Sequence, residues 1–502
     1  MKLFIYKYLV LIFFCSSVFY SACKREALDI LPNNPTEDTY FRNEAEFTAG
    51  IFGIYAKQSD FYWYNGSQNG SPLPIFILPG DDITISDQDE FEQFGQIQPA
   101  SGRLNYLFRR IYQMISRANI MLDKIEKEQG VYTTANLKNH HRGEAHFLRG
   151  LAYYYLWNIF GTAPLLPERV LRTDQLAPPG TTGAELLNQA IKDFTEADAV
   201  LPLQWDIANR GRATANAANG MLGKSYVLKG CISKSQADYA AAIVAFDKIT
   251  GVQLTAAFDD NFAADAENNE ESLFEYQATA PFGDDNVWLD NDFDRPIGSM
   301  SVFWGFYDNN FALFGKSRFF ATDKLLNAFD DADPRRELTL DPANKTFRKY
   351  VGARGRLTQS GVGSANNVRV LRYADVLLLK AEAMLKSGGS TVQAINLINT
   401  VRQRARRMQA GGTFPINRQT GETSIPVIMQ WIITERLLEL SGEGQRWFDL
   451  RRWHLSGDIT LNNAYFSSAT STMAFDAAKH LYFPIPSGEF DINPNVTQNP
   501  GY

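Results

Sequence analysis

Three stretches of the chain carry apolar residues at the spacing of one helix face. They cover about residues 106–160, 213–249 and 370–407. In the first stretch, most apolar positions are three or four residues apart: Leu107, Ile111, Met114, Ile115, Ala118, Met121 and Leu122. An α-helix completes a turn in about 3.6 residues, so these side chains fall on one side of it. The pattern predicts helical blocks and a mostly α-helical fold.

The second and third blocks each indicate two helices joined by a turn. Small residues stand where such helices would cross, at Gly223 and Ala242 in the second block and at Ala381, Ala383 and Ala394 in the third. Small residues at helix crossings are typical of tetratricopeptide repeats. A single pair cannot cover its own apolar face, so several pairs must stack. We therefore expect stacked, tetratricopeptide-like helix pairs.

Two long segments outside the blocks are rich in aromatic and acidic residues: residues 60–102 before the first block and 255–345 between the second and the third. Connectors of this length are commonly functional. Sugars stack their C–H faces on Trp and Tyr, while their hydroxyls need polar partners. This chemistry selects Trp63, Trp288 and Trp304 as stacking platforms, with Tyr62, Tyr64, Asp81 and Asp82 as polar and edge partners. The alternative for each aromatic residue is that it only fastens its loop to the body.

The first forty residues predict export and lipid attachment. Lys2 and Lys7 form a short positive region, an apolar run follows from Tyr8 to Phe19, and the small residues Ser21 and Ala22 precede Cys23. This is the order of a secretory signal, and a Cys after Ser-Ala fits a bacterial lipobox, in which the thiol is acylated. We predict a signal peptide at 1–22, a lipidated tether at 23–40 and a folded body at 41–502. An N-terminal transmembrane anchor is the alternative.

Charge and cysteine content exclude two classes of protein. The 502 residues include 49 Lys and Arg against 56 Asp and Glu, a net charge of −7. Without an excess of cations the chain is poorly suited to nucleic acid, because such binding depends on neutralising phosphates. The three cysteines, Cys15, Cys23 and Cys231, cannot build a disulfide framework.

The sequence contains no recognisable catalytic motif. It has neither a His-Glu-x-x-His zinc motif nor a Gly-x-Ser-x-Gly elbow. Residues 223–225 imitate the end of a phosphate loop, but Ala218 stands where its first Gly should be. Residues 290–294 resemble the opening of a calcium loop, but Arg295 replaces the required Gly and Ser301 the closing Glu. We predict a protein that is not an enzyme and has no cofactor or metal, with calcium in another geometry left open.

Several local strings are more specific than periodicity. They are Arg372-Tyr373-Ala374-Asp375 with Ala381-Glu382-Ala383; Glu435-Arg436 and Glu439-Leu440; Glu443-Gly444-Gln445-Arg446, Asp449-Leu450 and Arg452-Trp453; Phe483-Pro484-Ile485-Pro486; and Gln498-Asn499-Pro500-Gly501-Tyr502. Upstream stand Gly211-Arg212-Ala213-Thr214 and Asp333-Pro334-Arg335. Together they resemble the SusD/RagB family along the whole mature chain. The charged string at 435–452 alternates in sign at helix-turn spacings, and we interpret it as a network that locks a helix in place.

The resemblance implies a single body, with a helical part at 41–250 and a C-terminal part at 251–502 that includes the loop-rich insert 255–345. Tetratricopeptide-like pairs would form a superhelical platform, with short β elements at most and an irregular ligand-binding region. Family members are lipid-anchored, outward-facing outer-membrane proteins. They lie as a lid over a SusC-like TonB-dependent barrel and deliver polymer fragments, mostly glycans. Their ligand contacts lie on variable loops, so no binding residue is carried over.

The leading hypothesis is therefore a glycan-binding surface lipoprotein, monomeric when free, whose partners are a SusC-like barrel and the membrane through its lipid. A peptide-binding lid of a peptide importer is one alternative. A non-catalytic helical-repeat scaffold, with only protein partners, is the other.

Overall fold

The computed structural model describes residues 40–62, 72–86, 88–172, 175, 178–278, 317–351, 366–466 and 473–502. The chain divides into two compact units, residues 1–46 and 47–502. Helix α2 (Glu44–Tyr55) begins in the first unit and continues into the second. All other elements named below belong to the second unit.

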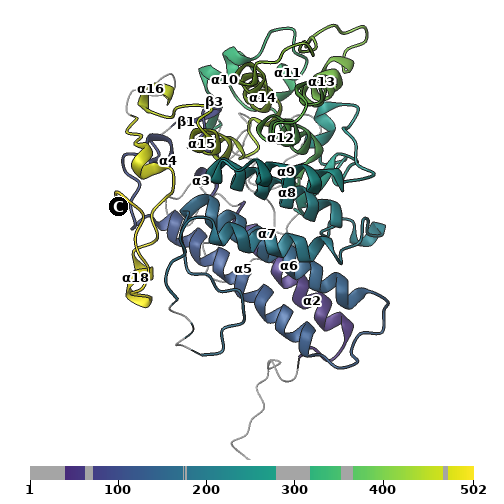
Figure 1. The fold of residues 1–502 in the computed structure, drawn as a ribbon, viewed down its shortest axis with the longest axis vertical. Coiled ribbons are helices and arrows are strands. Elements are labelled where there is room, and N and C mark those ends of the chain that lie inside the picture. Colours follow the sequence, from purple (N-terminus) through teal and green to yellow (C-terminus); the bar gives the residue numbers. More distant parts are fainter. Residues whose placement is uncertain are drawn as a thin grey trace, which may run out of the picture. The chain divides into compact units, whose positions relative to one another are not determined.

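The second unit is built mainly from long helices stacked side by side (Figure 1). They are α5 (Gly102–Lys127), α6 (Leu137–Phe160), α7 (Glu185–Asp198), α8 (Ala215–Ser233), α9 (Gln236–Asp247), α12 (Tyr373–Lys386), α13 (Thr391–Arg407), α14 (Ile425–Leu440) and α15 (Arg446–Ser456). From α5 to α9 each helix packs against the next, and α12 then joins α9 to α13 and α14. This array confirms the predicted mostly helical, tetratricopeptide-like fold.

Short elements connect the stack. The short helices are η3 (Ala56–Asp60), α3 (Leu73–Ile77), α4 (Glu90–Gln93), η5 (Ile207–Asn209), η6 (Phe258–Phe262), α10 (Asp323–Ala328), α11 (Arg336–Thr339), α16 (Asn463–Phe466), α17 (Ala477–His480) and α18 (Gly488–Ile492). Strand β1 (Ile83–Ile85) pairs antiparallel with β3 (Phe319–Ala321), and β2 (Ser272–Tyr276) pairs antiparallel with β4 (Val368–Arg372). The prediction of short β elements is confirmed for the described residues.

The helices begin where the sequence supplies caps and bury the predicted stripe. The side chains of Thr214, Ser235 and Ser390 accept a backbone hydrogen bond from the first turns of α8, α9 and α13, which satisfies an otherwise unpaired N–H. All residues of the predicted α5 stripe are buried except Leu122, which is half-buried. The predicted block 106–160 is divided into α5 and α6, and α7 was not among the predicted blocks.

Glycines allow α8 and α9 to approach closely. A Cβ at Gly223 would lie 2.3 Å from a ring carbon of Phe246, and one at Gly230 would lie 2.9 Å from the Tyr239 ring. Real Cβ atoms do not come so near, so any side chain there forces the helices or rings to move. The predicted role of small residues at this crossing is confirmed.

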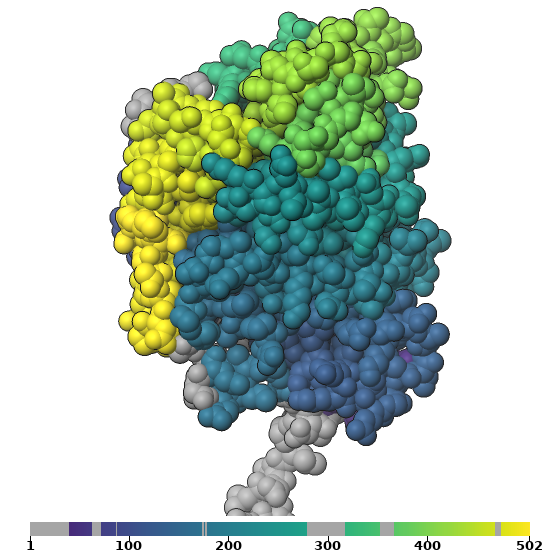
Figure 2. All heavy atoms as spheres, viewed as in Figure 1, coloured from purple at the N-terminus to yellow at the C-terminus, as the bar shows by residue number. Residues whose placement is uncertain are grey.

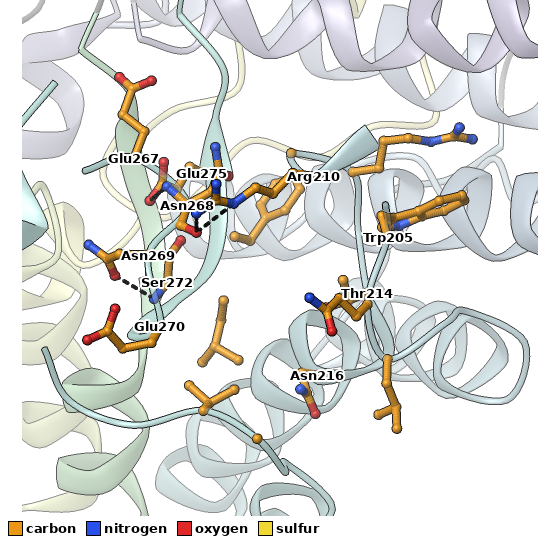
Figure 3. Close-up of a pocket in the computed structure, with 18 of the residues that line it drawn as sticks. Trp205, Arg210, Thr214, Asn216, Glu267, Asn268, Asn269, Glu270, Ser272 and Glu275 are labelled. Carbon is orange, nitrogen blue, oxygen red and sulfur yellow. Dashed lines mark hydrogen bonds between the residues drawn. The ribbon is translucent and has the colours of Figure 1, made fainter. Parts of the chain in front are cut away.

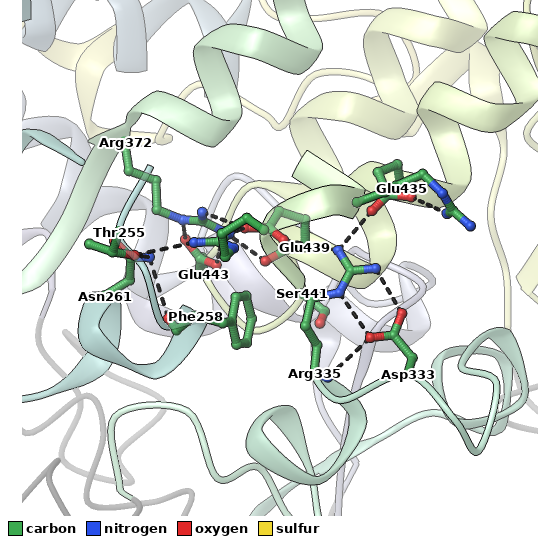
Figure 4. A network of polar contacts seen from close by, with 12 residues as sticks. Thr255, Phe258, Asn261, Asp333, Arg335, Arg372, Glu435, Glu439, Ser441 and Glu443 are labelled. Atoms are coloured by element: carbon green, nitrogen blue, oxygen red, sulfur yellow. Dashed lines mark hydrogen bonds and ion pairs between the residues drawn. The ribbon is translucent and has the colours of Figure 1, made fainter. Parts of the chain in front are cut away.

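A first cluster of buried ion pairs joins α13 and α14 to the segments around them (Figure 4). Arg335 contacts Glu435 at 2.7 Å and Glu439 at 3.0 Å. Arg372 contacts Glu439 at 2.7 Å and Glu271 at 2.8 Å. Five carboxylates face five cations, all at most 6% exposed: Asp333, Glu271, Glu435, Glu439 and Glu443 against Arg335, Lys349, Arg372, Arg402 and Arg404.

Glu439 shows why this cluster stays ionised. Burial by itself would raise the pKa of its carboxyl, but Arg404, Arg372 and Arg335 outweigh burial and hold the pKa well below its usual range. A buried pair stabilises a fold only when each charge keeps its partner. The cluster therefore requires one arrangement of these segments.

A second cluster joins α8, α12, α14 and α15. Arg436 contacts Asp375 and Asp449, each at 2.7 Å. Asp375 also forms an ion pair with Lys224 of α8 at 2.7 Å. Arg452 contacts Asp449 at 2.9 Å and pairs with Glu382 of α12. The two clusters confirm that the charged string at 435–452 locks helices in place.

The C-terminal segment lies against the ends of α6 and its neighbours (Figure 2, yellow against blue). The Phe483 backbone donates to Ile159 O at 2.8 Å, and the Asn499 side chain donates to Phe160 O at 2.7 Å. Gly161, at φ +73°, ends α6, and a Cβ there would meet the Tyr482 ring at 2.6 Å. The closing Pro-Ile-Pro and Gln-Asn-Pro-Gly-Tyr strings are therefore part of the scaffold.

We predict that Gly223→Ala lowers the free energy of unfolding by about 1–3 kcal/mol, because the new methyl group overpacks the contact with Phe246. Urea unfolding followed by circular dichroism measures this change. The matched control is Gly53→Ala within α2, where no atom lies within 4 Å of the new Cβ. That substitution should be neutral or stabilise by up to about 1 kcal/mol. Equal destabilisation by both would contradict the close crossing.

Candidate functional site: an aromatic pocket between α2, β2 and the start of α8

Tyr62 and Tyr276 come from the two segments predicted to bind ligand, 60–102 and 255–345, and they lie side by side. Their ring centroids are 5.6 Å apart. The register of β2 and β4 places Val368 opposite Tyr276. Segments far apart in the sequence thus meet at one place.

A cavity of about 340 Å³ opens beside this contact, and we call it the aromatic pocket. Its walls come from α2, η3, the segment before α8, and β2 with the residues after it. The lining residues are Phe52, Tyr55, Ala56, Gln58, Ala208, Asn209, Gly211, Arg212, Glu275, Tyr276, Gln277 and Ala278. Its volume lies at the lower end of the range for small-molecule sites, which are mostly apolar with a few convergent polar groups.

Gln58 lines the aromatic pocket and holds a buried hydrogen-bond acceptor. Its side chain is 2% exposed, and its Oε1 atom accepts no hydrogen bond from any described residue. A buried polar atom left unpaired costs about 1–3 kcal/mol. Because Oε1 itself is closed off from solvent, a ligand in the pocket reaches it only when the Gln58 side chain turns.

A buried ion pair holds the opposite wall. Arg212 donates two hydrogen bonds to Glu144 of α6, at 2.7 and 2.6 Å. Tyr55 donates to the same carboxylate at 2.9 Å and accepts from the Ala213 backbone at 2.8 Å. Burial and the Glu144 charge raise the pKa of Tyr55 well above its usual value, so its hydroxyl stays protonated. The Gly-Arg-Ala-Thr string therefore positions this wall as well as capping α8.

The described members of the predicted ligand set have interior contacts. Tyr62 is 6% exposed and lies 3.0 Å, hydroxyl to hydroxyl, from Tyr155. Asp81 contacts Arg446 at 2.5 Å, Lys324 at 2.7 Å and the Tyr465 hydroxyl at 3.1 Å. These contacts fasten the segment before β1 to α15 and α10. A ligand-binding role for these residues stays a prediction.

The pKa values of Asp81 and Asp82 are shifted in opposite directions. Burial would raise the pKa of Asp81, but Arg446 and Lys324 hold it well below its usual value. Asp82 is 2% exposed and accepts from the Gly442 backbone at 2.9 Å. Burial, with the neighbouring Asp81 charge, raises the pKa of Asp82 to about 6.

The other predicted site residues, Trp63, Tyr64, Trp288 and Trp304, lie outside the described residues, as do Cys23 and the calcium-like segment 290–294. Their roles stay predictions. Within the described residues, no group of three or more His, Cys, Asp or Glu could hold a metal ion. The same residues contain no helix that is both long and apolar enough to cross a membrane.

Sequence reasoning missed most of the aromatic pocket. Phe52, Tyr55, Gln58, Arg212 and Tyr276 were not selected as ligand contacts. Arg212 had a signal, because it belongs to the Gly-Arg-Ala-Thr string. The others stand in short segments whose meeting depends on long-range packing.

Two family models match the chain. The model described as "SusD family" matches residues 330–502, and the one described as "Starch-binding associating with outer membrane" matches residues 28–227. Among curated proteins, SusD-like protein P2 of Formosa agariphila is 25% identical, over 93% of this chain and 94% of its own length. Starch-binding protein SusD of Bacteroides thetaiotaomicron is 24% identical, over 95% of each chain.

Solved structures share the fold. A SusD homolog from Bacteroides thetaiotaomicron superposes with a TM-score of 0.75 at 21% identity, over 93% of this chain and 99% of that one. A laminarin-binding SusD-like protein superposes with a TM-score of 0.72 at 22% identity, over 92% of this chain and 100% of that one.

We predict opposite pH profiles for Asp82→Asn and Asp81→Asn. The folded pKa of Asp82 is raised from 3.8 to about 6, so its ionisation destabilises the native state as pH rises through this window. The stability of Asp82→Asn relative to the parent should therefore increase by about 1–3 kcal/mol between pH 4 and pH 7. Asp81 has a lowered folded pKa, so Asp81→Asn should cost stability at pH 7, and less as pH falls below 3.8. Urea unfolding across pH measures both, and parallel profiles would contradict the assignment.

Proposed function

The chain belongs to the SusD/RagB family, and from this premise we propose that it is a surface-exposed lipoprotein that binds oligo- or polysaccharide. It delivers the bound glycan to a SusC-like TonB-dependent transporter for uptake. Binding requires no catalysis and no cofactor. The lipid on Cys23 attaches the protein to the outer membrane, with the body facing the exterior.

One observation carries the glycan-binding proposal: the aromatic pocket combines ring faces with an unused buried acceptor. Phe52 and Tyr276 line the pocket with aromatic side chains, and pyranose C–H faces stack on such surfaces. A sugar hydroxyl that turns the Gln58 side chain toward the pocket gains Oε1 as an acceptor that no described residue uses. A sugar ring carries C–H faces and hydroxyls together, which match the aromatic rings and the acceptor of the pocket. The pocket therefore favours this class of ligand.

The relatives support the class of ligand and the location. One relative is a starch-binding protein and one structural neighbour binds laminarin. The model that matches residues 28–227 is described as associating with the outer membrane. The two relatives are named for different polymers. For this chain we therefore propose a saccharide ligand without naming the polymer. The transporter partner and the lipid anchor rest on the resemblance and on the signal and lipobox pattern around Cys23.

The first test is isothermal titration of the chain from Lys24 onward against starch, laminarin and a panel of other soluble polysaccharides, with and without calcium. We expect a binding heat for one polymer class that does not need calcium. A binding heat with a peptide digest and none with any polysaccharide would contradict the proposal and favour a peptide importer.

The second test separates binding from folding at Gln58. Gln58→Leu removes an unpaired buried acceptor, so the melting temperature should stay the same or rise. The same change should weaken binding of the responsive polysaccharide by about 1–2 kcal/mol, because a hydrogen bond to the sugar is lost.

The matched control is Gln189→Leu on α7, where Nε2 is also buried without a partner among the described residues but the side chain lines no part of the aromatic pocket. Its binding should equal that of the parent. Unchanged binding by Gln58→Leu would place the sugar elsewhere.

A further inference from the structure

A second and larger cavity, of about 810 Å³, lies on the other side of Gly211, and we call it the polar cleft. Its two walls face each other across an open space (Figure 3). Trp205, Thr214 and Asn216 lie on one wall, and the segment from Glu267 to Ser272 forms the other. The first wall leads into α8 and the second into β2. Neither the predicted ligand set nor the aromatic pocket accounts for this space.

The partition between the polar cleft and the aromatic pocket is thin. Gly211, Arg212 and Glu275 line both cavities. A Cβ at Gly211 would lie 2.3 Å from the amide carbon of Gln277. The Gln277 side chain is in turn paired with the Asn268 amide through two hydrogen bonds of 2.9 Å. The absence of a side chain at 211 thus lets the Gln277 side chain lie against the backbone between the two cavities.

Polar groups on the walls of the cleft are available to a ligand. Arg210 uses Nε and Nη2 to donate to the Asn268 carbonyl, at 3.2 and 3.0 Å, and its Nη1 makes no hydrogen bond to a described residue. Gln204 and Glu270 are exposed, and no described residue bonds to their side chains. Donors and acceptors are therefore mixed, which suits a ligand with many hydroxyls.

The charges of the cleft argue against an anionic ligand. Of its two arginines, Arg212 is already paired with Glu144, which leaves Arg210. Four carboxylates share the walls: Asp265, Glu267, Glu270 and Glu275. A phosphate or sulfate chain needs an excess of cations, and this cleft has the reverse. A neutral polyhydroxylated ligand fits these walls better.

Trp205 offers a fixed aromatic surface at the edge of the cleft. Its indole N–H donates to Ala213 O at 2.8 Å, and the Arg212 guanidinium lies 4.0 Å from the ring centroid. Leu203 and Ile207 stand beside it in sequence with 60% and 91% of their surfaces exposed. All three side chains line the cleft, and apolar surface of this kind is suited to the C–H faces of sugars.

We infer that the polar cleft is a second saccharide subsite, and that one neutral oligosaccharide extends from the aromatic pocket past Gly211 into it. This inference rests on the proposed function and adds the length of the ligand. The aromatic pocket is close to the lower limit for a small-molecule site and the polar cleft is near the upper limit. A chain of several sugar units occupies both, and a disaccharide occupies one.

The test compares short and long ligands. Malto- and laminari-oligosaccharides of two and of seven units are titrated into the parent chain and into Trp205→Ala. We expect the parent to bind the seven-unit member of one series at least tenfold more tightly than its disaccharide. Trp205→Ala should reduce this preference to threefold or less, because it weakens binding of the seven-unit ligand more than binding of the disaccharide.

A matched control shows whether removing any half-buried tryptophan has the same effect, and a second variant alters the cleft without touching Trp205. Trp431→Ala removes a tryptophan that is also half-buried under an arginine, Arg418 at 5.3 Å, but lines neither cavity. It should keep the full length preference. Gln204→Ala combined with Glu270→Ala removes two exposed side chains, so the fold is retained, and should also reduce the preference.

Binding in which both Trp205→Ala and the double variant keep the parent's length preference would overturn the second subsite and leave the proposed function intact. Absence of binding by the parent to either series at either length would count against the proposed function for these polymers, and the inference would fail with it.

Discussion

Buried ion pairs around the turn between α14 and α15 determine where the other segments of the body lie. Removing one partner from such a pair typically costs about 3–5 kcal/mol, because the remaining charge is stranded away from water. Lys349 donates to Glu439 O and Ser441 O, at 2.9 and 2.8 Å, and Arg372 contacts Glu443 at 2.9 Å. In the same turn, the backbone N–H of Gly442 donates a hydrogen bond to the Asp82 carboxylate. Segments from distant parts of the chain thus meet at one turn. All the charges are paired only when each of these segments has the position seen in the structure.

This constraint extends to the binding cavities through β2. Glu271 is held by Arg372 and Arg404, at 2.8 and 2.9 Å, immediately before the strand begins. Tyr276 ends the same strand and lines the aromatic pocket. On the facing wall, Arg212 is fixed by its ion pair with Glu144. The pocket walls are therefore positioned by buried ion pairs, of which Arg212 itself lines the pocket while Glu271, Arg372 and Arg404 do not.

The sequence predicts the local features of this architecture and misses the distant ones. Helix periodicity located α5, α6, α8, α9, α12 and α13, and Gly223 was identified at its crossing, because both depend on neighbours within one or two helices. Asp81 and Asp82 were selected as polar partners of a ligand, and that role stays a prediction. Their burial and the pairing of Asp81 with Arg446 carry no local signal, because the two partners are 365 residues apart. Gln58 carries no local signal at all. Its significance arises only when α2, β2 and the segment before α8 come together, which periodicity and spacing do not encode.

The most direct test is a crystal structure of the chain from Lys24 onward with maltoheptaose or laminariheptaose bound. We expect a sugar ring against Tyr276 with a hydroxyl within hydrogen-bond distance of Gln58 Oε1, further units toward Trp205, and both ion clusters unchanged. A sugar bound elsewhere, with both cavities free of it, would contradict the assignment of these cavities as the binding site.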